Sequence, residues 1–72
     1  MSTLPDWQLL LTAREREVVH LVIQGLCNKE IARQLGITES STKQHLAHVF
    51  KKLKIHTRTR LVVYALSSGT QI

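Results

Sequence analysis

The sequence predicts an all-α fold, a four-helix bundle-like domain that contains a helix-turn-helix. Apolar residues recur at the i, i+3, i+4, i+7 spacing of one helix face in successive segments. Residues that favour helix starts precede these segments, and a glycine follows two of them. Together these observations place helices at about residues 13–24, 28–35, 39–53 and 58–67.

The composition describes one small domain. The 72 residues are 43% hydrophobic, which is typical of a globular chain near the lower size limit for independent folding. The longest run without a charged residue is far too short to span a bilayer. The single cysteine cannot form an internal disulfide, so we expect a cytoplasmic protein. Residues 1–10 are interpreted as a lead-in, 11–67 as the folded domain and 68–72 as a C-terminal tail.

The start of the first helix carries a capping signal. Thr12 and Glu15 form the T-x-x-E pattern, in which each side chain accepts a hydrogen bond from the other residue's backbone amide. Apolar residues follow at helical spacing, and Gly25 suits the left-handed conformation that ends many helices. This pattern predicts the helix at 13–24.

The next two segments predict a pair of helices joined by a tight turn. Gly36 stops the helix at 28–35, and Thr38 is a suitable N-cap for the helix at 39–53. Two helices joined by a short turn that contains glycine form a helix-turn-helix.

The helix at 39–53 has two contrasting faces. The spacing of a buried face is shared by Leu46, Val49, Phe50 and Leu53. The opposite face has no acidic residue after Glu39 and carries small or amide side chains near its start and lysines near its end. A solvated helix face usually mixes both charge signs, so this face is typical of one that lies against an anionic partner.

The last predicted helix, at 58–67, follows Thr57, which can cap it. Its apolar residues cover more of the helix circumference than one small core can bury, which favours either packing on the first helix or an exposed stripe for self-association. The side chains expected to stay partly exposed for a weak dimer contact are Val62, Val63 and Leu66.

Charge is divided unevenly along the chain. Residues 1–39 contain four basic and five acidic side chains, whereas residues 40–72 contain six basic side chains and no acidic one. The excess positive charge therefore gathers in the second half, where it attracts polyanions. Nucleic acid is the usual polyanion, and no helix pairs basic residues with the large aromatic face of a membrane-surface helix.

The chain resembles the LuxR-type helix-turn-helix family. The matching residues, in order, are L-T-x-R-E-R-E-V at 11–18, Gly25, N-K-E-I-A at 28–32, Leu35-Gly36-Ile37, Lys43, His45, Lys52-Leu53 and Arg58. This family forms the C-terminal DNA-binding domain of many bacterial response regulators and quorum-sensing regulators. The resemblance implies a four-helix domain whose third helix enters the major groove and whose fourth helix often forms a dimer contact.

Three positions depart from the usual family pattern. Cys27 stands where serine is common, and because a thiol is a poor cap we expect Asn28 to cap the second helix. Thr42 replaces valine and places a hydroxyl on the buried face, where it needs a partner. Arg60 replaces a glutamate of the last helix and adds positive charge.

Contacts with double-stranded DNA can be assigned on this basis. Side chains of the third helix predicted to face base edges are Ser40, Lys43, Gln44 and Ala47, because amide, ammonium and methyl groups match major-groove features. The residues assigned to phosphates are Lys29, Ser41, His45, Lys51, Lys52, Thr57 and Arg58.

Other functions are less well supported by the sequence. His45 and His48, three apart on a helix, form only half of a metal site, so we expect no metal. No nucleophile–base pattern or glycine-rich phosphate loop is present, so we expect neither an enzyme nor a cofactor, and no small-molecule ligand. The alternative hypothesis is a protein–protein interaction module that reuses the helix-turn-helix, for example by binding an RNA polymerase subunit.

Overall fold

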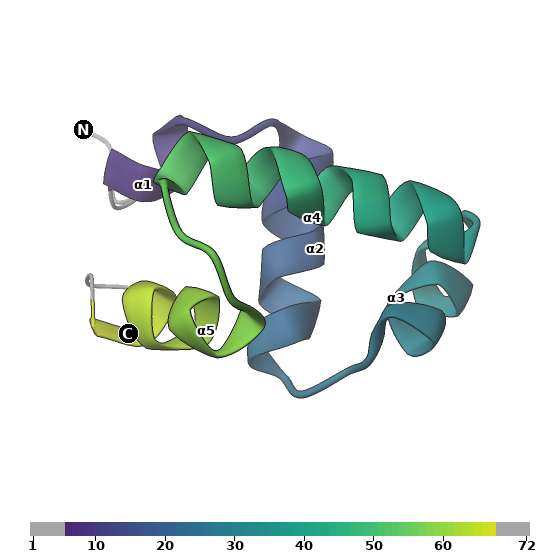
Figure 1. Cartoon of the computed structure of the whole chain (residues 1–72). Helices are drawn as coiled ribbons and strands as arrows, with labels where there is room; N and C mark the ends of the chain where they lie inside the picture. The colour runs from purple at the N-terminus through teal and green to yellow at the C-terminus, as the bar shows by residue number, and fades with distance from the viewer. Residues whose placement is uncertain (1–5, 68–72) are drawn as a thin grey trace.

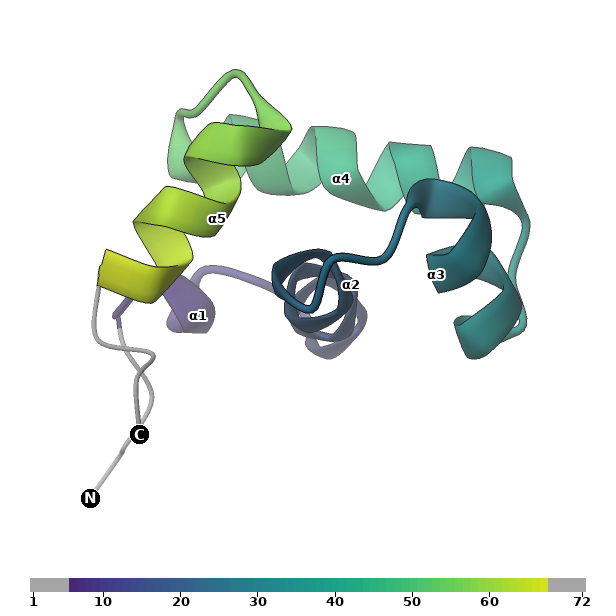
Figure 2. The ribbon, with the colours of Figure 1, turned by 90° about the horizontal axis from the view of Figure 1, so that it is seen from below.

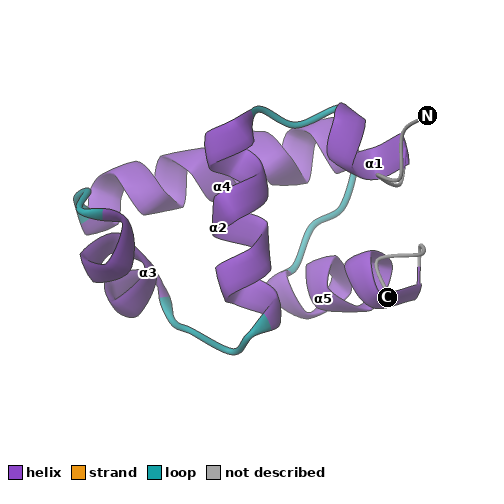
Figure 3. Cartoon of the chain, turned by 180° about the vertical axis from the view of Figure 1, so that it is seen from behind, coloured by secondary structure: helices purple, strands orange, loops and turns teal. Residues whose placement is uncertain are grey.

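The computed structural model describes residues 6–67, and this part of the chain is all-helical (Figure 3). Its helices are α1 (Asp6–Leu9), α2 (Ala13–Ile23), α3 (Asn28–Leu35), α4 (Glu39–Leu53) and α5 (Arg58–Ser67). The predicted all-α fold with a helix-turn-helix is confirmed. Three of the predicted helices have the observed bounds, and α2 ends one residue earlier than expected because Gln24 is its C-cap. The proposed tail at 68–72 lies outside the described residues.

The helices pack around α2. In Figure 1, α2 crosses α4 at a steep angle, and Figure 2 shows α2 end-on with α3 on one side and α5 on the other. The contacts are consistent with these views, because α2 packs on α3, α4 and α5, and α3 packs on α4. Among the helices of residues 6–67, this arrangement leaves one long side of α4 uncovered (Figures 1 and 2).

Capping interactions hold the helix starts as predicted. The Glu15 backbone N–H donates to Thr12 Oγ1 at 3.1 Å, and the Thr12 N–H donates to Glu15 Oε1 at 2.9 Å, which completes the capping box. Ser41 N–H donates to Thr38 Oγ1 at 2.9 Å, and Arg60 N–H donates to Thr57 Oγ1 at 3.1 Å. Each bond satisfies an amide that the helix itself leaves unpaired.

The expectation that Asn28 caps the second helix is wrong. Cys27 occupies the N-cap position, and its backbone N–H donates to Glu30 Oε1 at 2.8 Å. The Glu30 carboxylate thus reaches back over the first turn and compensates for the weak thiol cap. Asn28 is the first residue of α3, and its side chain is free for another role.

Within the lead-in, residues 6–9 form the short helix α1, which was not among the predicted helices. Trp7 and Leu11 are buried in the core, whereas Leu9 and Leu10 are more than half exposed. The Trp7 ring meets Tyr64 of α5 edge to face, with ring centroids 6.3 Å apart. The large indole drives α1 onto the core, which a pattern of single apolar residues does not reveal.

The core lies where α2 meets α4 and α5. Its most deeply buried hydrophobic side chains are Val18, Val19, Ile31, Val49, Leu61 and Ala65, each 0% exposed. Because α2, α3, α4 and α5 all contribute to this cluster, the position of α4 depends on the whole domain.

Candidate nucleic-acid interface

The exposed face of α4 is the most distinctive surface of the described chain. Its buried side consists of Thr42, Leu46, Val49 and Leu53, as the sequence predicts. The Thr42 hydroxyl donates to the Thr38 carbonyl oxygen at 3.2 Å, which provides the partner that a buried hydroxyl needs. The buried side therefore fixes the rotation of α4 about its own axis.

The residues assigned to base contacts all lie on the opposite side. Ser40, Lys43, Gln44 and Ala47 are exposed, and beyond Glu39 this side of α4 has no acidic residue. Its cations and hydrogen-bonding groups therefore project outward from a helix that is held by the core. This geometry suits a helix that enters the major groove, which is wide enough to admit one.

One flank of α4 is tied to α2 by a buried carboxylate. The Lys52 ammonium donates to Glu15 Oε1 at 2.7 Å, and His48 Nδ1 lies 4.0 Å from Glu15 Oε2. The Glu15 side chain is 5% exposed and that of Lys52 is 37% exposed. The sequence predicts that Lys52 contacts a DNA phosphate. In the structure its ammonium group already pairs with the Glu15 carboxylate.

The surroundings of Glu15 stabilise its charged form. Burial alone raises the pKa of its carboxyl, but the hydrogen bonds from Lys52 and from the Thr12 amide, with the nearby charges of Lys52 and His48, more than offset burial. The net pKa is lowered from the ordinary carboxyl value. The hydrogen bond from the Cys27 amide likewise lowers the pKa of Glu30. Both carboxylates therefore act as caps, and Glu15 is also an ion-pair partner; with lowered pKa values, both are ionised at neutral pH.

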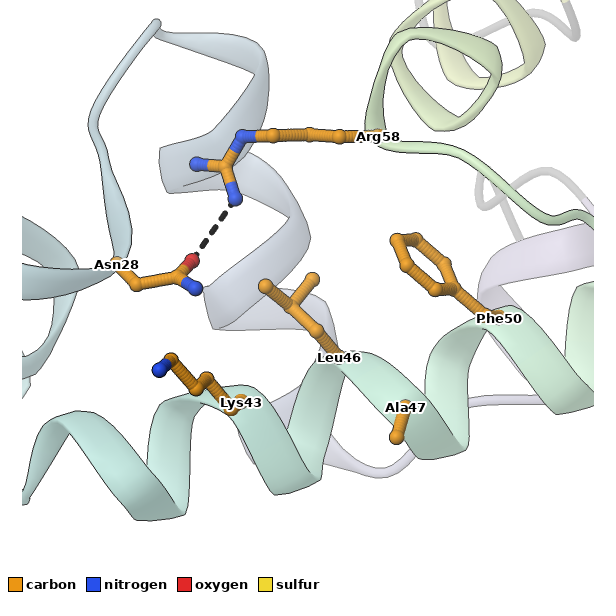
Figure 4. A pocket seen from close by; sticks show the side chains of 6 residues that line it. All are labelled: Asn28, Lys43, Leu46, Ala47, Phe50 and Arg58. Carbon is orange, nitrogen blue, oxygen red and sulfur yellow. Dashed lines mark hydrogen bonds between the residues drawn. The ribbon is translucent and has the colours of Figure 1, made fainter.

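The other flank of α4 contains a hollow of about 340 Å³. Figure 4 shows its lining residues, which are Asn28, Lys43, Leu46, Ala47, Phe50 and Arg58. Arg58 reaches from α5 to α3, where its Nη1 donates to Asn28 Oδ1 at 2.8 Å and its Nη2 donates to the Leu26 carbonyl oxygen. The guanidinium thus joins the start of α5 to the start of α3 at the edge of the candidate interface.

The remaining residues assigned to phosphates vary in exposure. Lys29, Lys51 and Thr57 are exposed, whereas Ser41 and His45 are partly buried. Asn28 also belongs to this surface, although the sequence did not single it out. Phe50, which the sequence places on the buried face, is only partly buried and lines the hollow as well. The 3.6-residue period places Phe50 on the same flank as Lys43 and Ala47, but no local signal connects Asn28 with Arg58, which is 30 residues away.

The apolar side of α5 is only partly covered, as expected. Leu61 and Ala65 are 0% exposed against the core, whereas Val63 is 50% and Leu66 is 55% exposed. Val62 is partly buried and packs against the core cluster. Val63 and Leu66 therefore leave aliphatic surface exposed on α5.

The described residues contain neither a metal-binding cluster nor a membrane-spanning helix. Between residues 6 and 67, no group of three or more His, Cys, Asp or Glu side chains could hold a metal ion. None of the helices in that range is both long enough and apolar enough to cross a membrane.

Comparisons with known proteins agree with the motif pattern. The model of the family "Bacterial regulatory proteins, luxR family" matches residues 9–65. The chain is 50% identical over 54 residues to the nitrate/nitrite response regulator protein NarL of Escherichia coli K12, covering 75% of this chain and 25% of NarL. It is 49% identical over 57 residues to the monoamine regulon transcriptional regulator of Klebsiella aerogenes, covering 79% of this chain and 25% of that protein.

A third relative is the transcriptional regulatory protein LnrK of Bacillus subtilis, which is 40% identical over 68 residues, covering 94% of this chain and 31% of LnrK. The chain therefore spans about a quarter to a third of the length of these relatives. The family is one of bacterial regulatory proteins. Because the family model covers most of the folded residues and the helix-turn-helix is present, the chain belongs to the luxR family of bacterial regulatory proteins.

Proposed function

We propose that the chain binds double-stranded DNA in a sequence-specific manner, as the DNA-binding part of a bacterial transcriptional regulator. The observation that carries this proposal is the outward face of α4, which has no acidic residue after Glu39 and is presented by a helix-turn-helix. Its relatives include a response regulator and transcriptional regulators, which supports the same role for this chain.

In this proposal α4 lies in the major groove. Lys43 can donate to guanine acceptors, Gln44 can make a bidentate contact with adenine, and the Ala47 methyl can contact a thymine methyl. Ser40 lies one turn before Gln44 at the start of the same face. Phosphate contacts would come from Lys29, Ser41, His45, Lys51, Lys52, Thr57 and Arg58, of which Lys52 and Arg58 also have the internal partners described above.

Selection of bound duplexes from a random DNA pool tests the proposal directly. We expect a defined half-site, bound with an affinity that falls steeply between low and moderate salt, because cations on the protein displace counterions from the phosphates. A protein–protein interaction module would enrich no sequence and would show no such salt dependence on duplex DNA.

Replacing Gln44 with alanine tests base readout. The variant should lose preference at one position of the half-site, at a cost of about 1–3 kcal/mol on the cognate duplex, because a bidentate contact would be lost. The control is Gln34→Ala, which removes an exposed glutamine from α3. An unchanged preference profile for Gln44→Ala would remove Gln44 from the reading surface.

We also propose that two copies pair through α5 on DNA. Half-sites on one DNA face are separated by about 34–36 Å. The described part of each copy extends 34 × 25 × 19 Å, so two adjacent copies can present α4 to successive major grooves. An interface formed by a single short helix would be far smaller than a standard one, so the dimer should be weak when it is free in solution.

Introducing a charge at Val63 tests this pairing. Val63→Glu should leave the fold and binding to a single half-site intact but abolish cooperative binding to a paired site, because a carboxylate would be buried in the contact. Gln34→Glu provides the same charge on α3 and should preserve cooperativity. Cooperativity that survives in Val63→Glu and Leu66→Glu, separately and together, would show that α5 is not the contact.

A further inference from the structure

Lys54 adopts a backbone conformation that is unusual for its residue type. It is the C-cap of α4, with φ 57° and ψ 44°, and within residues 6–67 it is the one non-glycine residue with positive φ. Glycine or asparagine usually occupies this left-handed position, because a Cβ makes it unfavourable. The lysine therefore costs stability at a site where glycine would fit. Among the described residues, neither an ion pair nor a hydrogen bond engages its ammonium group.

The Lys54 side chain lies at the edge of two surface hollows. It is exposed and lines two adjoining hollows, one of about 490 Å³ with Phe50 and Lys51, and one of about 340 Å³ with Arg60. The larger of the two also shares Ala47 and Phe50 with the hollow in Figure 4. The three hollows therefore adjoin one another through shared lining residues along α4 and the loop after it, and we call them together the basic strip.

The basic strip has a composition that differs from the rest of the surface. The lysines and arginines that line it are Lys43, Lys51, Lys54, Arg58 and Arg60, and no acidic residue lines any of its three hollows. Phe50 and Ile55 line the same hollow as Lys51 and Lys54 and contribute apolar surface there. By contrast, the hollow on α3 includes Glu30 beside Arg33.

This combination of cations and apolar side chains suits one strand of DNA, which presents both charged phosphates and deoxyribose rings. The strip is also continuous with the proposed reading surface, since Lys43 and Ala47 belong to both. The opposite flank of α4 fits a phosphate strand less well, because there Lys52 is paired with Glu15.

We propose that Lys54 binds a backbone phosphate of the DNA, at the end of a track for one strand that runs along the basic strip. This inference rests on the proposed DNA binding and adds Lys54 and Arg60 to its phosphate contacts. It also accounts for the lysine in a left-handed position, since stability lost in the free domain is recovered as affinity for DNA.

Substitution of Lys54 by glycine distinguishes an effect on DNA binding from an effect on the stability of the domain. Lys54→Gly removes the charge and relieves the backbone, so it should melt at the same temperature as the parent or a few degrees higher. It should nevertheless bind all duplexes several-fold more weakly at about 0.1 M salt. The slope of log affinity against log salt concentration should be smaller in magnitude by about one. Lys54→Arg keeps the charge and should retain the parent slope. Arg33→Gln, which removes an exposed cation from α3, should also leave the slope unchanged.

The possible results distinguish the role of Lys54 from DNA binding by the chain as a whole. Lys54→Gly that binds duplex DNA as tightly as the parent, with the same salt slope, would overturn the role of Lys54 and leave the proposed DNA binding standing. A parent chain that binds no duplex DNA at low salt, or that binds only anionic lipid vesicles, would overturn both proposals.

Discussion

Leu61→Ala is expected to remove about 2–5 kcal/mol from the free energy of unfolding, a large share of the stability of so small a domain. Leu61 is 0% exposed and fixes α5 against the core cluster. A domain of this size has a total stability of about 4–10 kcal/mol. The variant should therefore be partly or largely unfolded at 37 °C, and urea denaturation followed by helical circular dichroism would measure the loss.

Leu66→Ala is the matched control for this prediction. It makes the same chemical change in the same helix at a side chain that is 55% exposed, and it should cost well under 1 kcal/mol. Equal shifts of the urea midpoint for the two variants would contradict the assignment of the buried side of α5. Because α5 packs on α2, loss of DNA binding by Leu61→Ala would report unfolding and not a lost DNA contact.

Lys52→Met should cost about 2 kcal/mol at pH 7, because it leaves the Glu15 carboxylate buried without its ammonium partner. The cost is smaller than for a fully buried pair, since the Lys52 side chain is 37% exposed. Lys51→Met changes the preceding residue, which is exposed and has no partner among the described ion pairs. It should leave stability nearly unchanged and weaken DNA binding.

The pH dependence gives this prediction a second test. In the parent chain the pKa of Glu15 is lowered by folding, so its contribution to stability is present above the ordinary carboxyl pKa and is lost as the pH falls. In Lys52→Met burial would dominate and raise the pKa, so protonation would favour the folded state. The stability difference between the two proteins should therefore shrink from pH 7 to pH 4. A difference that is constant with pH would show that Lys52 does not stabilise the Glu15 charge.

The two flanks of α4 therefore have different expected roles. On one flank, Glu15 binds Lys52 and holds α4 against α2. On the other flank, the cations of the basic strip other than Arg58 are exposed, namely Lys43, Lys51, Lys54 and Arg60. A single helix thus combines a structural edge and a proposed binding edge. Replacing Lys52 should lower stability, whereas replacing Lys51 or Lys54 should lower DNA affinity without a loss of stability.

Much of the fold could be predicted because its signals are local. The capping box at Thr12, the stop at Gly36 and the buried face of α4 each depend on residues within a few positions of one another, whose geometry the helical period dictates. The exposure of Gln44 follows from the same period. The missed features were α1, where one buried indole outweighs a weak helical pattern, and the N-cap at Cys27, where a glutamate compensates for the thiol.

The sequence by itself determined the helices, the helix-turn-helix and the acid-free face of α4. Only the tertiary structure decided which basic side chains remain available for a partner. Lys52 meets a carboxylate 37 residues away, and Arg58 meets an amide oxygen 30 residues away, so their engagement depends on how the helices cross. The angles at which the helices cross are set by side-chain packing in the core that they share. No short-range spacing of residues along the sequence encodes these angles. For the same reason, Lys54 emerges as a proposed contact only once the hollows between α4 and α5 are seen together.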